Sequence, residues 1–322
     1  MEKRMPKREE INRLVMIARE YYVNRKTQAE IAEEFDLSRP TISKLLQEAE
    51  DANIVQISII DPLYRDSELA SRLQDALQLQ NVVVVHGDPK NQGISQKNIA
   101  LNAAWYFCKM VDDTVHKIGI GWGRTMYQVS LAMETAVRND LQFIPLLGGV
   151  GQINPSFQVH QITQRVADVC GGTWLQLHVP GIIENKEIRK NLLNSRDVQN
   201  VISNWENLDL ALVGIGEAPP FKRNIIFESY VDDEEKTQLL EKKAVGDICM
   251  RFFDIHGKII NYLKQEIISI PLNVLKNTQR VIAAAGGSRK ARSIIGASRG
   301  GFITDLVTDE DTGNEILQIL NQ

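Results

Sequence analysis

Three glycine-rich turns carry the residue types in this chain that are best suited to bind a small anion. Each turn follows an apolar run and precedes a helical pattern, and the three are Gly119–Thr125, Gly148–Gly151 and Gly286–Lys290. Glycine lets a backbone approach a ligand, and the N-terminus of a helix offers N–H groups and a favourable dipole to an anion. Arg124 adds a charge and Thr125 a hydroxyl. The set predicts a site for an anionic small molecule such as a sugar phosphate; the alternative is that the glycines serve only the geometry of tight turns.

One carboxylate stands among apolar neighbours in the stretch Gly246–Asp254. Asp247 could accept hydrogen bonds from the hydroxyls of a ligand, or it could serve the fold as a cap or an ion-pair partner. His256 is expected on a surface turn, while His160, at the start of a helix, could reach the site or be structural. The three cysteines have no metal-ligand spacing, so the sequence predicts neither a metal site nor a catalytic group.

Alternating apolar runs and helical patterns place these turns on a sheet. Residues 82–85 form a continuous apolar run, which is typical of a strand buried on both faces of a parallel sheet. The sequence predicts further strands at 115–121, 141–147, 173–179, 210–214, 281–285 and 303–308. It predicts helices at 95–111, 125–137, 158–170, 186–195 and 198–204. This alternation indicates an α/β fold with a mostly parallel sheet, whose strand ends bring the turns to one edge.

The stretch Thr27–Ala49 has the pattern of a helix-turn-helix. Thr27 and Glu30 have the spacing of a capping box, and Ser38 can cap a second helix that has Pro40 in its first turn. Asp36 stands where the turn between the helices needs a left-handed residue. The pattern predicts a DNA-binding motif whose recognition helix begins at Ser38.

The exposed start of that second helix carries short hydroxyls and cations, which suit phosphate oxygens and base edges. The residues expected to contact double-stranded DNA are Ser38, Arg39, Pro40, Thr41, Ser43 and Lys44. A helix over residues 9–23 would precede the motif, and the β-rich run 55–60 would form the strand of a wing. An ordinary helical hairpin with a solvated face is the alternative.

Length and charge limit the class of protein. We expect a DNA-binding domain at 1–60, a linker with a possible oligomerisation helix at 61–80 and an effector domain at 81–322. The net charge of −4 gives no general sign of nucleic-acid binding, since even the first sixty residues hold ten Lys or Arg against eleven Asp or Glu. No stretch approaches about eighteen consecutive apolar residues and no signal peptide opens the chain. We therefore expect a cytoplasmic protein with no membrane partner.

Together with the helix-turn-helix, the motifs GIGWGRTM, LLGGVG, AVGDICMRFFDIHG, AAAGGSRKARSI and TDEDT resemble the SorC family of bacterial transcriptional regulators. The resemblance covers nearly the whole chain and is greatest for the deoxyribonucleoside-regulator and autoinducer-2-regulator branches. It implies a winged helix-turn-helix domain joined to a Rossmann-like effector domain of the sugar-phosphate isomerase type, without catalysis and without a cofactor. It also implies a homo-oligomer, usually a tetramer, whose DNA affinity is set by a phosphorylated sugar or similar metabolite.

By this resemblance the effector-binding residues fall in all three glycine turns and in the stretch that contains Asp247. They are Gly121, Gly123, Arg124, Thr125, Gly148, Gly149, Asp247, Cys249 and Lys290. Relatives can carry Lys or Arg just before the second glycine pair, for a Schiff base or a phosphate, whereas this chain has Leu147. A Schiff base at that position is therefore excluded.

The expectation that follows is a DNA-binding regulator of carbohydrate uptake or catabolism whose operator affinity depends on a bound sugar phosphate. An enzyme on the same fold is the main alternative, but the fused helix-turn-helix and the lack of an acid–base pair beside the turns disfavour it. A nicotinamide-dependent enzyme is disfavoured further, because Arg124 stands where G-x-G-x-x-G requires its third glycine. A DNA-binding scaffold without an effector is the remaining alternative.

Overall fold

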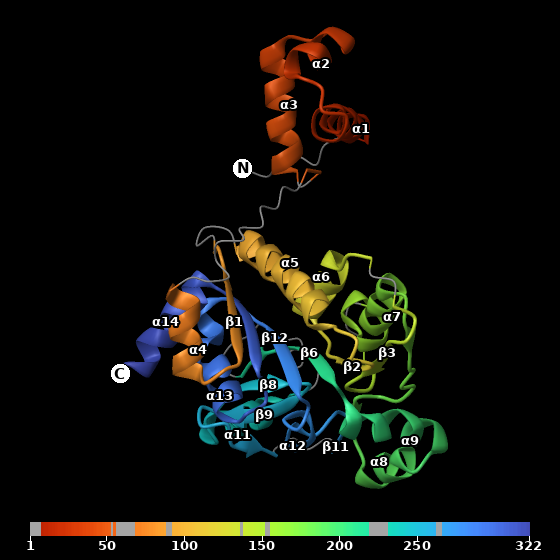
Figure 1. Cartoon of the computed structure of the whole chain (residues 1–322), viewed down its shortest axis with the longest axis vertical. Coiled ribbons are helices and arrows are strands. Elements are labelled where there is room, and N and C mark those ends of the chain that lie inside the picture. Colours follow the sequence, from red (N-terminus) through yellow and green to blue (C-terminus); the bar gives the residue numbers. More distant parts are fainter. Residues whose placement is uncertain are drawn as a thin grey trace. The chain divides into compact units, whose positions relative to one another are not determined.

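Two units make up the chain in the computed structural model, Met1–Ile59 and Ile60–Gln322 (Figure 1). The structure describes residues 8–52, 54–55, 68–87, 92–135, 138–151, 155–218, 231–261 and 266–322. The first unit consists of α1 (Arg8–Ala18), a π-helical turn η1 (Arg19–Val23), α2 (Gln28–Glu34) and α3 (Arg39–Asp51). The run 9–23, predicted to be helical, is therefore helical, with π geometry in its last turn.

The turn between α2 and α3 has the local chemistry that the sequence predicts. The Glu30 N–H donates to Thr27 Oγ1 while the Glu30 carboxylate accepts from the Thr27 N–H, which completes the capping box. Ser38 caps α3 by accepting a hydrogen bond from the Thr41 N–H at 3.3 Å. Asp36 has a φ of +51°, the left-handed conformation expected there. These caps set where each helix begins.

A small apolar core holds α1, α2 and α3 together. Its buried members are Ile17, Ile31, Ala32, Ile42 and Leu46. They come from all three helices, so the core fixes the position of α3 against the other two. The predicted wing strand at 55–60 lies outside the described residues except for its first position, which is a bend.

A seven-stranded parallel sheet is the frame of the second unit. The strands lie in the order β1, β13, β12, β6, β2, β3, β4, and each neighbouring pair is parallel. Their bounds are β1 (Asn81–Val85), β2 (Lys117–Ile120), β3 (Gln142–Pro145), β4 (Thr173–Trp174), β6 (Leu210–Gly214), β12 (Arg280–Ala284) and β13 (Asp305–Asp309). The chain runs outward from β2 to β4 on one side and from β6 to β13 on the other. The order thus reverses between β2 and β6, and open α/β sheets bind ligands at such a point.

Two apolar layers cover the faces of this sheet. On β1, Val82 and Val84 belong to one layer and Val83 and Val85 to the other, because successive side chains of a strand alternate. Helices α4, α13 and α14 supply the first layer, and α5, α6 and α7 the second (Figure 1). The bounds are α4 (Glu68–Leu77), α5 (Gln92–Met110), α6 (Arg124–Ala132), α7 (Val159–Cys170), α13 (Ala291–Arg299) and α14 (Glu310–Leu320).

A second sheet, antiparallel and not predicted from the sequence, follows β6 directly. Its order is β10-β9-β8-β7, with β7 (Gly216–Glu217), β8 (Ala244–Ile248), β9 (Arg251–Asp254) and β10 (Ile259–Ile260). A short pair joins β5 (Ile182–Ile183) to β11 (Glu266–Ile267). The remaining elements are η3 (Pro155–Phe157), α8 (Lys186–Leu193), α9 (Arg196–Ile202), η4 (Ser203–Asn207), α11 (Asp233–Glu241), α12 (Leu272–Leu275) and η5 (Ser288–Lys290). Of the extended run predicted at 173–179, only β4 is a strand.

Helix α4 lies in segment 61–80, which the sequence interpretation set apart as a linker with a possible oligomerisation helix and of which the structure describes residues 68–80. Its residues Ala70, Leu73 and Leu77 are buried in the core of the second unit. Gly313 of α14 allows a close approach, since an added Cβ would lie 2.8 Å from Leu73 Cδ1. The apolar side of this helix, which we considered for an oligomer contact, therefore packs within the chain. Over the described residues, none of the helices combines the length and apolar character needed to cross a bilayer.

Candidate functional site

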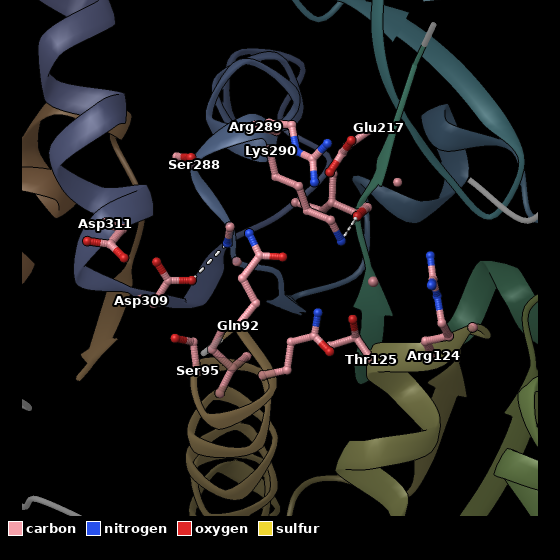
Figure 2. A pocket seen from close by; sticks show the side chains of 18 of the residues that line it. Gln92, Ser95, Arg124, Thr125, Glu217, Ser288, Arg289, Lys290, Asp309 and Asp311 are labelled. Atoms are coloured by element: carbon pink, nitrogen blue, oxygen red, sulfur yellow. Dashed lines mark hydrogen bonds between the residues drawn. The ribbon is translucent and has the colours of Figure 1, made fainter. Parts of the chain in front are cut away.

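A cavity of about 600 Å³ opens at the carboxyl ends of β2, β6, β12 and β13, beside the point where the strand order reverses (Figure 2). Its walls come from the first and third glycine turns, the hairpin after β8 and the first turns of α5 and α14. A volume of this size suits a small-molecule ligand. The structure thus brings together two of the three glycine turns predicted to form a site.

The first glycine turn presents a helix N-terminus to the cavity. Gly123, with a φ of +100°, is the N-cap of α6 and has no side chain with which to cap it. The first N–H groups of α6 have no intrahelical partner, and Arg124 and Thr125 line the same wall. Gly121 stays outside the lining, where its N–H donates to Leu212 O at 2.9 Å. This wall can therefore offer several donors and a positive charge to one anionic group.

The third glycine turn has the same layout but a different neighbour. Gly287 has a φ of +97°, which favours glycine, and its N–H donates to Asp309 Oδ2 at 2.8 Å. A Cβ on Gly286 would collide with the same carboxylate oxygen. Asp309 also caps α14, since its Oδ1 accepts from the Thr312 N–H at 2.8 Å. One buried carboxylate thus joins the third turn to α14.

Lys290 ends this turn and lines the cavity. Its Nζ donates to Ile215 O at 2.8 Å. Burial lowers the pKa of the Lys290 ammonium, while the carboxylates of Glu217, Asp247 and Asp309 act in the opposite direction. The ammonium therefore already has a carbonyl partner and three acidic neighbours.

Asp247 and Cys249 reach the cavity from the hairpin that joins β8 to β9. Ile248 pairs with Arg251, so the loop has two residues, and both Cys249 (φ +49°) and Met250 (φ +63°) are left-handed. Such a type I′ turn usually contains Asn-Gly, so these residues store strain. Asp247, which is 4% exposed, accepts a hydrogen bond from the Met250 N–H at 3.2 Å. Burial and this carboxylate raise the pKa of the Cys249 thiol, which is not a nucleophile here.

The second glycine turn does not line the cavity. A Cβ on Gly148 would lie 2.5 Å from Val179 O and 2.7 Å from Gly181 N. The Gly149 N–H donates to Val179 O at 2.8 Å, and the Gly181 N–H donates back to Gly149 O at 2.6 Å. The sequence interpretation placed Gly148 and Gly149 in the effector site. In the structure neither lines the cavity: Gly148 closely approaches the backbone of residues 179–181, and Gly149 is hydrogen-bonded to it.

The histidines considered above also lie away from the cavity lining. His160 and His178 stack with ring centroids 6.1 Å apart, and His256 is exposed in the turn after β9. Burial, followed by the neighbouring His178, lowers the pKa of His160. Over the ranges that the structure describes, there is no cluster of three His, Cys, Asp or Glu able to hold a metal ion.

Sequence reasoning missed several polar residues of the cavity. Gln92 and Ser95 come from the first turn of α5, Glu217 from β7 and Asp311 from α14 (Figure 2). Glu315 also comes from α14. Four of them fall on helices, where single polar residues carry no signal, and Glu217 lies on a two-residue strand. They give the cavity an acidic side next to α14 and β7.

Helix α3 presents most of the residues predicted to meet DNA. Arg39, Ser43 and Lys44 are exposed along one side, and Gln47 continues that side one turn later although the sequence interpretation did not include it. Lys44 Nζ lies 3.6 Å from a Glu48 carboxylate oxygen. The remaining three residues form the first turn of the helix.

That first turn is held by its own hydrogen bonds. The hydroxyls of Ser38 and Thr41 are 2.7 Å apart, and Ser38 also caps the helix. Pro40 has no N–H to donate, and it stands in the first turn of the helix, where an N–H would have no intrahelical partner. Ser38 and Thr41 therefore position α3, while the exposed side chains offer donors.

Known proteins resemble the chain over nearly its whole length. Residues 61–318 match the profile of the family described as "Putative sugar-binding domain". The deoxyribonucleoside regulator of Bacillus subtilis is 31% identical to this chain over an alignment that covers 94% of this chain and 96% of the regulator. The crystal structure of the full-length sorbitol operon regulator SorC from Klebsiella pneumoniae matches with a TM-score of 0.74 at 27% identity, over 97% of this chain and 99% of that one. The crystal structure described as "Probable sor Operon Regulator from Shigella flexneri" matches with a TM-score of 0.71 at 29% identity, over 77% of this chain and 98% of that one. The chain belongs to this SorC family, as a DNA-binding transcriptional regulator of carbohydrate metabolism under effector control rather than an enzyme.

Proposed function

We propose that the effector is a phosphorylated sugar held in the cavity with its phosphate at the N-terminus of α6. The observation that carries this proposal is the uncapped start of α6 beside Arg124 and Thr125 in a cavity of about 600 Å³. Helix N–H groups, a guanidinium and a hydroxyl are the donors that phosphate oxygens use. Asp247 and Lys290, further along the cavity, supply an acceptor and a donor for sugar hydroxyls.

A binding experiment tests this assignment. Thermal unfolding and calorimetric titration of the full chain with fructose 6-phosphate, glucose 6-phosphate, ribose 5-phosphate and the free sugars should show stabilisation by at least one phosphate ester and by none of the free sugars. Arg124→Ala should weaken binding by about 1.5–3 kcal/mol, the worth of a hydrogen bond to a charged group. Arg196→Ala removes a cation that is also exposed but lies outside the lining, and this variant should bind the effector like the parent. Equal losses of binding affinity in the two variants would contradict the proposed position of the phosphate at the N-terminus of α6.

We infer that α3 reads the operator with Arg39, Ser43, Lys44 and Gln47, positioned by the capped first turn. Short hydroxyls, amides and cations on the exposed side of a recognition helix are the groups that reach bases and phosphates. With an operator fragment selected from genomic DNA, Arg39→Ala should cost about 1–3 kcal/mol if it contacts a base. If Lys44 contacts phosphate alone, Lys44→Ala should weaken all sequences alike and reduce the salt dependence. Unchanged operator binding by a variant that carries both Arg39→Ala and Lys44→Ala would contradict this role of α3.

The regulator should act as a cytoplasmic homo-oligomer of even order, and we propose a tetramer. One recognition helix covers few base pairs, so two copies related by a twofold axis are needed to bind two half-sites. Light scattering at micromolar concentration should give four times the chain mass of 36.3 kDa. A mass equal to one chain would refute the proposal.

A further inference from the structure

We propose that the cavity admits a single anionic group, and that Asp309 enforces this by occupying the third glycine turn with an internal carboxylate. The inference rests on the proposed function, because it narrows the effector class to sugars with one phosphate. The third glycine turn, Gly286–Lys290, would then exclude an anion, although its sequence predicts that it binds one.

The two turns of the cavity have the same backbone design. Each follows a strand of the parallel sheet, contains a glycine with φ near +100° and leads into a helical turn, with Gly123 (φ +100°) in the first and Gly287 (φ +97°) in the third. A phosphate could use N–H groups of either turn if nothing else were bound there. What differs between the turns is the group that faces the N–H donors.

In the third turn that group is Asp309. Its Oδ2 accepts from the Gly287 N–H at 2.8 Å, and its Oδ1 accepts from the N–H and hydroxyl of Thr312 at 2.8 and 2.9 Å. Both carboxylate oxygens are therefore engaged, and Asp309 is only 1% exposed. The carboxylate is part of the fold rather than a mobile side chain that a ligand could push aside.

Further negative charge surrounds this end of the cavity. The cavity lining includes Asp247 and Glu315. It also includes Glu217, Asp309 and Asp311, and the nearby cations are Arg289 and Lys290 (Figure 2). Lys290 Nζ already donates to Ile215 O, and Glu217, Asp247 and Asp309 are the acidic groups that act on it. A second phosphate at this end would meet an excess of like charge in a partly desolvated site.

The first turn contributes no carboxylate to the lining: Trp122, Gly123, Arg124 and Thr125 are its lining residues. An anion there meets the start of α6 and a guanidinium. The cavity therefore has one end that favours an anion and one that favours neutral hydroxyls or a cationic group. A sugar monophosphate fits this division, and a bisphosphate does not.

Calorimetric titration of the full chain with matched ligands tests the inference. The pairs are fructose 6-phosphate with fructose 1,6-bisphosphate, and glucose 6-phosphate with glucose 1,6-bisphosphate. The monophosphate of at least one pair should bind roughly tenfold or more tightly than its bisphosphate, from the repulsion of like charges at short range. Asp309→Asn keeps the size and an acceptor oxygen but removes the charge, and it should reduce that preference at least several-fold. Asp311→Asn, which removes an exposed carboxylate that is not bound to the turn, should change the preference less.

Each outcome decides a separate point. Bisphosphates that bind the parent as well as monophosphates would overturn the inference while the proposed function stands. Failure of every phosphate ester to bind would overturn the proposed function as well. An Asp309→Asn variant that folds and keeps the full preference for the monophosphate would show that Asp309 does not exclude the second anionic group. If that variant does not fold, the comparison on the parent protein still decides whether the cavity takes one anion.

Discussion

Gly148→Ala separates two explanations of the second glycine turn. If the turn binds effector, the added methyl should weaken effector binding and leave stability nearly unchanged. In the structure, however, the new Cβ would lie 2.5 Å from Val179 O, and 2.7 Å from both Gly181 N and the Pro180 carbonyl carbon. These are backbone atoms held by the hydrogen bonds between Gly149 and residues 179–181, so they cannot yield as the end of a side chain could.

The expected cost is that of overpacking a close contact, about 1–3 kcal/mol. For a folding unit of this size, 1 kcal/mol lowers the melting temperature by about 2–4 °C. Gly148→Ala should therefore melt about 2–12 °C below the parent by these figures. Gly149→Ala is the matched control, because its Cβ would have no neighbour nearer than 3.7 Å, and it should melt like the parent.

Thermal unfolding and effector titration of both variants decide between the explanations. A destabilised Gly148→Ala that binds effector normally below its melting temperature supports the structural role. Normal stability in Gly148→Ala together with lost effector binding would refute the reasoning, since the close contacts would then be absent. Weakened effector binding in Gly149→Ala would indicate that the second glycine turn does contact the effector.

Three further predictions concern single groups. Tyr106→Phe removes the hydroxyl that donates to the buried Asp305 carboxylate at 2.5 Å, and urea unfolding should show a loss of about 1–3 kcal/mol. His160 has its pKa lowered from 6.5 by burial and by His178, so the unfolded state binds more protons and stability should fall as the pH drops below 6.5. In His160→Phe the melting temperature should depend less on pH over that window. Asp36→Gly should relieve the left-handed φ of +51° and slow amide exchange in α2 and α3, for a gain of about 0.5–1 kcal/mol.

Elements that could be predicted from the sequence are those specified by local signals. The strands of the parallel sheet appear as apolar runs because both faces are buried, as the alternating residues of β1 show. The capping box at Thr27 and the left-handed Asp36 follow from residue type and spacing alone. The antiparallel sheet could not be predicted in the same way. Strands such as β7 (Gly216–Glu217) are too short to show a period, and β8 has Asp247 in an otherwise apolar run.

Prediction of the site had the corresponding limit. Gly123, Arg124 and Thr125 were identified because a strand, a glycine turn and a helix follow one another in the sequence. Glu217 and Asp311 reach the same cavity from elements far apart along the chain, and no local pattern marks them. Gly148 shows the converse case. Glycine indicates that something approaches the backbone closely, but its sequence context cannot say whether a ligand or another chain segment does so.

The third turn shows why local pattern and binding role can diverge. Asp309 caps the last helix, α14. Its second oxygen binds Gly287, 22 residues earlier in the chain, and only the pairing of β12 with β13 brings the two together. The third turn would offer N–H groups to an anion if it stood alone, but its Gly287 N–H already donates to the carboxylate that caps α14. The first turn contributes no carboxylate to the cavity lining, and α6 begins there with Gly123, whose N–H donates to Phe157 O at 3.2 Å. The asymmetry between two similar turns thus arises from which of them has an acidic residue placed opposite it by the sheet.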